Sequence, residues 1–227
     1  MNSALISIII PTINEIENLS NLLENIKKSK QADKVEIVVV DGGSTDGTIE
    51  YADKYADLVI SAQLGRASQL NAGAEVAQGK NFWFLHADSI LDFNIFSQYL
   101  HVISSSDWGR FDIKINNPKL IYLLISSLIN FRSRLSKIAT GDQGIFISQE
   151  LFYQVGKFPQ LDLMEDVALS AKLKKHSAPF CSKLKIKTSA RKWQKEGVLK
   201  TILLMWKLRL LYFFGVNTKT LARLYYK

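Results

Sequence analysis

Two hydrophobic patterns alternate along the first 90 residues of the chain. Continuous apolar runs predict buried strands over residues 5–10, 35–40, 58–61 and 82–86. Between them, apolar side chains recur at helical spacing and predict helices over residues 15–28, 45–55 and 66–77. Strands that are apolar at every position are typical of a parallel sheet covered on both faces, so the pattern predicts an α/β fold. Pro11 follows the first run and is expected to end that strand.

The second half of the chain is less regular. Strands are predicted over residues 108–115 and 144–147, and a helix that opens with two acids over 164–173. Residues 119–137 predict an amphipathic helix with Lys, Ser and Asn on one side and leucines on or near the other. Residues 199–214 are apolar on nearly all sides, so this helix must be covered by protein or lie at a membrane interface.

Length and composition indicate a globular protein. The chain has 227 residues, which fits one large domain or one domain with an appendage, and 47% of them are hydrophobic. Cys181 is its only cysteine, so an internal disulfide and a four-cysteine zinc site are excluded, in agreement with a reducing compartment. The first apolar run is too short for a signal peptide, and no run is long enough to span a membrane. We therefore expect a cytoplasmic protein.

The net charge of +8 is unevenly distributed. Residues 183–227 hold 12 Lys and Arg but one acid, Glu196, whereas the rest of the chain holds 17 basic and 20 acidic residues. A basic, apolar tail indicates phosphate-rich partners or an anionic membrane surface, such as the inner face of the plasma membrane. A solvated pair of basic helices is the alternative. Nucleic-acid binding is not expected, because the tail has no recognisable reading motif.

Three carboxylates follow predicted strands of the first half: Glu15 just after Pro11, then Asp41, then Asp88. The carboxyl ends of parallel strands share one edge of the sheet, where open α/β folds bind small molecules. Each acid taken alone could be a turn or cap residue. Together they predict a polar site at this edge.

His86 and Asp88 are two residues apart, so on an extended segment they point to the same side. One imidazole and one carboxylate can share a divalent metal such as Mn²⁺. The alternative for His86 is a hydrogen-bonded histidine at a strand end.

Other polar residues are ambiguous when taken alone. Glu165 and Asp166 open a predicted helix. They could cap this helix, or one of them could be a general base near an acceptor hydroxyl. The loop Gly141-Asp142-Gln143-Gly144 permits close approach of a ligand to the backbone. Arg66 could contact a diphosphate or be a surface cation.

Several common motifs are missing. The chain has no P-loop, and its Gly-Gly-Ser-Thr-Asp-Gly turn does not match the dinucleotide fingerprint. It also has no nucleophile elbow.

Taken in order, four segments resemble family 2 glycosyltransferases of the GT-A fold over about residues 5–175. They are Pro11-Thr12-Ile13-Asn14-Glu15, Val40-Asp41-Gly42-Gly43-Ser44-Thr45-Asp46-Gly47, His86-Ala87-Asp88 and Glu165-Asp166. More narrowly, other segments resemble the bacterial subgroup named radical-SAM/selenodomain-associated transferase 2. These include Gly65-Arg66-Ala67-Ser68-Gln69-Leu70-Asn71-Ala72-Gly73-Ala74, Gly141-Asp142-Gln143-Gly144 and Thr188-Ser189-Ala190-Arg191-Lys192-Trp193.

The resemblance implies a Rossmann-like, mostly parallel sheet flanked by helices, followed by a basic helical tail. The GT-A domain would cover residues 1–190, with a nucleotide-binding half to about residue 90 and an acceptor half over 91–190. Residues 191–227 would form the basic, apolar extension.

The resemblance also implies residue roles. Asp41 would accept a hydrogen bond from the nucleoside base, and Glu15 would lie near the ribose. The full nucleotide-binding set would be Pro11, Glu15, Asp41, Gly43, Arg66 and Ala87. Asp88 would hold Mn²⁺ or Mg²⁺ on the diphosphate. His86 stands where the family's Asp-x-Asp motif has its first acid, which removes a negative charge and favours softer ions than Mg²⁺.

Asp166 would be the base of an inverting displacement, with Gly141, Asp142, Gln143 and Glu165 on the sugar or acceptor side. The implied reaction moves a sugar from a nucleotide-diphosphate sugar, with UDP favoured, to an acceptor hydroxyl that could be lipid-linked. Two alternatives stay open. A sugar-nucleotide nucleotidyltransferase would normally carry a glycine-rich basic loop after the first strand, where this chain has Pro-Thr-Ile-Asn-Glu. A non-catalytic nucleotide-binding protein is supported only by His86.

Overall fold

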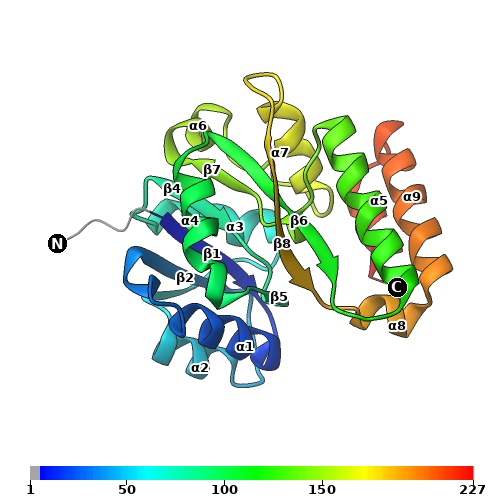
Figure 1. The fold of residues 1–227 in the computed structure, drawn as a ribbon. Coiled ribbons are helices and arrows are strands. Elements are labelled where there is room, and N and C mark those ends of the chain that lie inside the picture. The colour runs from blue at the N-terminus through cyan, green and yellow to red at the C-terminus, as the bar shows by residue number, and fades with distance from the viewer. Residues whose placement is uncertain (1–5, 227) are drawn as a thin grey trace.

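The computed structural model describes residues 6–226, so Leu5 of the first predicted strand lies outside the described residues. The strands form one eight-stranded sheet in the order β3-β2-β1-β4-β7-β6-β8-β5. Helices pack on both faces of this sheet, and three more helices follow the last strand along the chain, β8 (Figure 1). The strands are β1 (Ile6–Thr12), β2 (Val35–Asp41), β3 (Leu58–Ser61), β4 (Asn81–Phe84), β5 (Ser89–Ile90), β6 (Trp108–Ile115), β7 (Phe146–Ser148) and β8 (Phe180–Thr188).

The α-helices connect these strands or follow them. They are α1 (Ile16–Lys27), α2 (Thr48–Tyr55), α3 (Arg66–Val76), α4 (Phe96–Ser104), α5 (Leu120–Ser136), α6 (Gln149–Gln154), α7 (Glu165–Leu173), α8 (Arg191–Glu196), α9 (Val198–Phe213) and α10 (Thr218–Tyr225). Short 3-10 turns are η1 (Ala32–Lys34), η2 (Phe93–Ile95) and η3 (Gly141–Gln143). None of the helices between residues 6 and 226 has both the length and the apolar character needed to cross a bilayer.

The first four strands are mutually parallel, as the continuous apolar runs predict. β1 pairs with β2 and with β4, and β2 pairs with β3, all in parallel register. The predicted end of β1 is wrong, because the strand continues through Pro11 to Thr12, opposite Asp41. Pro11 is tolerated because its missing N–H would point toward β4, whose pairing with β1 already ends at Ile9 and Phe84.

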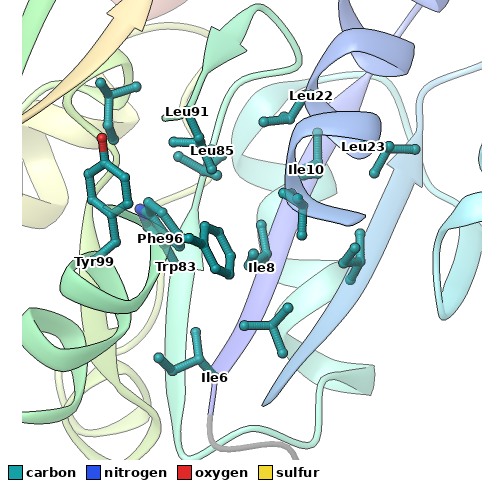
Figure 2. Close-up of a cluster of buried hydrophobic side chains, with 14 of the residues drawn as sticks. Ile6, Ile8, Ile10, Leu22, Leu23, Trp83, Leu85, Leu91, Phe96 and Tyr99 are labelled. Carbon is teal, nitrogen blue, oxygen red and sulfur yellow. The ribbon is translucent and has the colours of Figure 1, made fainter. Parts of the chain in front are cut away.

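Both faces of the parallel half are covered. One apolar cluster joins β1, β2 and β4 to α1 and α4, and Figure 2 shows Ile8, Ile10 and Trp83 facing Leu22, Leu23 and Phe96. A second cluster on the other face joins Ile9, Val38 and Val40 to α3 and α7. Burial on both sides explains why these strands carry no polar alternation.

Helix α3 lies unusually close to the sheet. A Cβ atom on Gly73 would come within 2.5 Å of Ile9 Cγ2 and 2.8 Å of Val40 Cγ2, so only glycine fits there. One turn earlier, the buried Gln69 side chain donates from Nε2 to the carbonyl oxygens of Thr12 and Val40, both at 2.9 Å. These contacts fix α3 across the carboxyl ends of β1 and β2.

The second half contains elements that the pattern does not predict, notably α4 and β8. β8 is parallel to β6, while β7 is antiparallel to both β4 and β6. Lysines alternate with apolar residues along β8, so it lacks the continuous apolar run that marks the buried strands. The predicted helix over residues 45–55 begins later, at Thr48, after Gly47 in a left-handed conformation with φ 89°.

Helix α5 packs with its polar side inward. β7 pairs with β6 only at Trp108 and Gly109, so the rest of that edge of β6 has no neighbouring strand. Asn130 fills the gap: its Oδ1 accepts from Ile113 N at 2.9 Å and its Nδ2 donates to Ile113 O at 3.0 Å. Ser126 Oγ accepts from Ile115 N at 3.0 Å. The leucines on the other side of α5 consequently face outward.

The last three helices close against the domain. Leu208 of α9 and Leu221 of α10 are fully buried and share an apolar cluster with Leu163 and Met164, which precede α7. The C-terminal helices thus pack beside the start of α7 (Figure 1).

Replacing Asn130 with Leu is expected to lower the free energy of unfolding by about 2–4 kcal/mol, because two buried backbone groups of Ile113 would lose their partners. Urea unfolding measures this loss. Ser127→Ala, at an exposed position of the same helix, is the matched control and should change stability by less than about 0.5 kcal/mol. Equal stability of Asn130→Leu and the wild type would contradict the role of α5 in binding the backbone at the edge of β6.

Candidate active site

The turn after β2 is held by Asp41. This carboxylate is 1% exposed, and its Oδ2 accepts from Gly43 N at 2.7 Å and from Ser44 N at 2.9 Å. Ser44 Oγ donates to Asp41 Oδ1 and also accepts from Asn14 N at 2.8 Å. Asp41 therefore has the turn-forming role that the sequence left open. A nucleoside base that contacted Asp41 would have to share the carboxylate oxygens with the turn.

Asn14 joins the two loops at the sheet edge. It adopts a left-handed backbone conformation with φ 50°, and its Oδ1 accepts from Thr45 N at 2.8 Å. Sequence reasoning gave no role to Asn14 or to Gln69. Both stand inside the quoted motifs, but neither had a sequence signal of its own.

The other residues predicted on the nucleotide side lie around these loops. Pro11 is inside β1, and Ala87 is buried in the cluster of Figure 2. Gly43 has φ 107°, a conformation that favours glycine. Glu15 precedes α1 and accepts from Arg191 Nη2 of α8 at 2.9 Å. This exposed ion pair adds little stability, but it shows that the start of α8 lies beside Glu15.

Asp88 lies where several charged segments meet. Burial raises the pKa of its carboxyl, and the nearby Glu15 and Asp142 raise this pKa further, while Arg66 and Arg191 oppose them. The expectation that His86 and Asp88 share an extended segment is wrong. β4 ends at Phe84, and Ser89 N donates to His86 O at 3.0 Å, which closes a turn around Asp88.

His86 is held neutral. Burial lowers the pKa of its imidazole to about 3, and the positive charge of Arg66 acts in the same direction. The ring packs against Gly141, where an added Cβ would come within 2.4 Å of His86 Nε2. A glycine at this position therefore lets the 141–144 loop approach the end of β4.

The 141–144 loop also contacts the start of α7. Gly141 N donates to Asp166 Oδ2 at 2.8 Å, and Val167 N donates to Asp166 Oδ1 at 2.7 Å. Gln143 is fully buried, and its Oε1 accepts from Thr140 N at 3.1 Å. The loop thus brings Asp166 toward His86, while Gln143 stabilises the loop from inside.

Glu165 and Asp166 both hold protons more tightly than ordinary carboxyls. Burial raises the pKa of Glu165 to about 7, with a further contribution from Asp166, and the positive charge of Arg66 opposes this rise. Burial also raises the pKa of Asp166, against the lowering effect of its two backbone hydrogen bonds and of Arg66.

Two arginines lie near this carboxylate pair. Arg66 opens α3; burial disfavours its charged form, but Tyr226, Glu165 and other neighbours raise its pKa above the ordinary value. Arg132 of α5 is a residue that sequence reasoning missed. Burial lowers its pKa, while Asp142 and Asp166 oppose the shift, and within residues 6–226 its Nε and Nη2 find no hydrogen-bond partner.

A cavity of about 10 Å³ lies among His86, Gly141, Glu165 and Asp166. It has room for one water molecule at most, so a larger ligand enters this end of the site only after the surrounding side chains move.

The carboxylates at the site suit a hard divalent cation. Within the described part of the chain, no three His, Cys, Asp or Glu side chains are grouped closely enough to hold an ion on their own. Asp88 nevertheless suits a cation. Burial and the nearby Glu15 and Asp142 disfavour its negative charge, and a bound cation would compensate that charge. Carboxylate oxygens are ligands that Mg²⁺ and Mn²⁺ prefer.

These features define an α/β protein with an acidic site at the carboxyl edge of a mostly parallel sheet. The sequence pattern of "Glycosyl transferase family 2" matches residues 7–142. The chain therefore belongs to glycosyl transferase family 2, as its motifs predict. The narrower resemblance to the radical-SAM-associated subgroup stays a prediction.

Three known proteins illustrate the similarity. The chain is 37% identical over 98 residues to a PGL/p-HBAD biosynthesis glycosyltransferase of Mycobacterium bovis, a match that covers 40% of this chain and 38% of that relative. It is 22% identical to the mannosyltransferase PcManGT from Pyrobaculum calidifontis, solved with GDP-Man and Mn²⁺, with a TM-score of 0.63 over 81% of this chain and 56% of that one.

The third is S. aureus TarS 1-349 in complex with UDP-GlcNAc, which is 21% identical with a TM-score of 0.60. That match covers 81% of this chain and 58% of the other. The two structural similarities confirm the GT-A fold.

Glu165→Gln should change the pH dependence of stability. The pKa of Glu165 is 4.5 in an unfolded chain and about 7 in the fold. The contribution of this carboxyl to the free energy of unfolding is therefore complete below pH 4.5 and is lost as pH rises toward 7. The glutamine variant avoids this loss. We expect it to be more stable than the wild type at pH 8, by roughly 3 kcal/mol at most, and nearly equal at pH 4.

Urea unfolding at both pH values measures the difference. Glu150→Gln, at an exposed position of α6, is the control and should show no such pH dependence. If Glu165→Gln were less stable than the wild type by the same amount at pH 4 and pH 8, burial would not disfavour the charged form of this carboxyl.

Proposed function

We propose that this chain is a metal-dependent, inverting glycosyltransferase that moves a sugar from a nucleotide-diphosphate sugar, with UDP-sugar favoured, to an acceptor hydroxyl. The observation that carries the proposal is that Glu15, Asp142 and Arg66 lie near enough to Asp88 for their charges to affect its pKa, and that Arg66 and Asp142 also affect the pKa of Asp166. The two proteins of similar fold were solved in complex with UDP-GlcNAc and with GDP-Man, which supports a nucleotide-sugar donor.

On the donor side, Asp41 and Glu15 would contact the nucleoside, with Pro11, Gly43 and Ala87 completing its surroundings. Arg66 would face the diphosphate. Arg191 would join this set, because it pairs with Glu15. Guanidinium groups suit a diphosphate because they can donate two parallel hydrogen bonds to its oxygens.

Asp88, with His86 beside it, would hold Mn²⁺ or Mg²⁺. When bound, the metal would neutralise charge on the leaving diphosphate. The neutral state of His86 is compatible with metal binding, since only the unprotonated imidazole is a ligand.

Asp166 is the proposed base. It would take the proton of the acceptor hydroxyl while the acceptor oxygen forms a bond to the anomeric carbon and the bond from that carbon to the diphosphate breaks. Attack from the face opposite the leaving group inverts the configuration. The raised pKa of Asp166 supports this role, because a base is most effective when its pKa approaches the working pH. Gly141, Asp142, Gln143 and Glu165 would form the sugar or acceptor side.

The remaining parts of the proposal concern organisation and location. Residues to about 90 would bind the nucleotide, residues 91–190 would bind the acceptor, and residues 191–227 would be the basic extension. The protein would be cytoplasmic and peripheral on the inner face of the plasma membrane, where a lipid-linked acceptor is available.

A thermal-shift screen of nucleoside diphosphates with and without Mn²⁺ tests the donor side. We expect UDP to raise the unfolding temperature only when the metal is present, because a ligand that binds the native state stabilises it. GDP and ADP are the comparison ligands. The absence of a shift with every diphosphate, with or without metal, would overturn the donor assignment.

Asp166→Asn tests the base. Transfer, followed as release of the nucleoside diphosphate from its sugar nucleotide, should fall by about 10²–10⁴, the usual contribution of a general base. The diphosphate-induced thermal shift should persist. Asp162→Asn, at an exposed position four residues earlier, is the matched control. Full activity of Asp166→Asn would show that another group accepts the proton.

A further inference from the structure

Helices α5 and α9 expose a series of large apolar side chains. Each of these residues has at least 55% of its surface exposed, and together we name them the α5–α9 face: Leu120, Leu124, Leu128, Phe131 and Leu135 of α5, and Leu199, Leu203, Trp206, Leu210 and Phe213 of α9. Their spacing of three and four residues places them along one side of each helix. Contiguous apolar surface of this kind is rare on monomeric soluble proteins and marks an interaction site.

The two halves of this face adjoin each other. Tyr122 and Ile125 of α5 belong to the same apolar cluster as Val198 and Ile202 of α9. Figure 1 shows the two helices side by side, at the end of the molecule away from α1 and α2.

The fold fixes the orientation of both helices. Asn130 and Ser126 bind the β6 edge, so α5 cannot turn its leucines inward without leaving Ile113 and Ile115 unpaired. Thr201 and Leu208 are the buried residues of α9 and hold its opposite side against the protein. The exposed face is therefore a consequence of the same contacts that complete the sheet.

The charged residues within helices α5 and α9 are all basic. Residues 120–136 and 198–213 contain no acid, whereas Lys200 and Lys207 are exposed beside the stripe of α9. Lys119 and Lys137 are exposed at the two ends of α5. If two copies met through this face, their like charges would be brought together, which disfavours such pairing. Anionic lipid headgroups would instead complement every one of these cations.

We propose that the α5–α9 face is the surface that inserts into the headgroup region of an anionic bilayer. Leucine, tryptophan and phenylalanine on one side with flanking lysines is the composition of helices that lie in the membrane interface. The lysine stems can extend along the apolar surface while the ammonium groups reach the headgroups. The proposal rests on the peripheral membrane location in the proposed function and assigns the surface that would contact the membrane. Half of this surface belongs to α5 rather than to the C-terminal tail.

This placement orients the candidate active site. The same helix that would meet the lipid carries Arg132, which is close enough to Asp142 and Asp166 for their charges to affect its pKa. The acceptor side would thus lie next to the bilayer surface.

Vesicle flotation tests the surface. The full chain should bind vesicles of phosphatidylcholine with phosphatidylglycerol, bind those of phosphatidylcholine alone less well, and be released by salt. Leu124→Glu/Leu128→Glu should reduce partitioning to the anionic vesicles at least about tenfold, because two exposed leucines lose their favourable transfer. Phe93→Glu, at an exposed apolar position on η2, is the matched control and should bind as the wild type does.

Point substitutions are preferable to removal of the tail, which would uncover the cluster around Leu208 and Leu221. Unchanged melting and an unchanged nucleotide shift show that the variant is folded and separate this test from that of the proposed function. Vesicle binding that survives the α5 double substitution, or no binding by the wild type, overturns the proposal. So does a dimer, measured by light scattering, that the same substitution dissociates, because a second copy would then cover the face.

Discussion

Hydrogen bonds from buried side-chain amides to the backbone shape both halves of this molecule. At the ends of the strand pairing, helices supply amide side chains that bind backbone groups. Gln69 binds the carbonyl oxygens of Thr12 and Val40 and thereby places α3, with Arg66 at its start, across the ends of β1 and β2. Asn130 does the same for Ile113 on β6. The candidate site and the exposed α5–α9 face both result from these amide contacts.

Much of the parallel half could be predicted from sequence because its signals are local. Continuous apolar runs predict four parallel strands, which the structure confirms. Glu15 and Asp88 follow strand ends, and Asp41 is the last residue of β2. Predictions failed where pairing decides the outcome. Pro11 stays in β1 because its neighbour on that side has ended. β8 was not predicted, although lysines that alternate with apolar residues are the pattern of a half-buried strand; it pairs with β6 on one side and β5 on the other.

The candidate site was predictable in its members but not in their contacts. Motif spacing singled out Asp88 and Asp166, yet it could not show that Asp88 lies in a turn or that Asp166 accepts from Gly141. Arg191 was quoted in a motif and given no role, because 176 residues separate it from Glu15. Arg132 gave no sequence signal at all, since a basic residue on a predicted amphipathic helix is ordinarily solvated. Such long-range contacts depend on the packed fold.

The close packing at Gly73 has a consequence for how this family can vary. A side chain at this position would occupy the space of Ile9 Cγ2 and Val40 Cγ2, two atoms on neighbouring strands of the sheet. A larger residue at 73 is therefore compatible with the fold only when positions 9 and 40 become smaller. We therefore expect these three positions to vary together, and their packing sets the distance between α3 and the sheet.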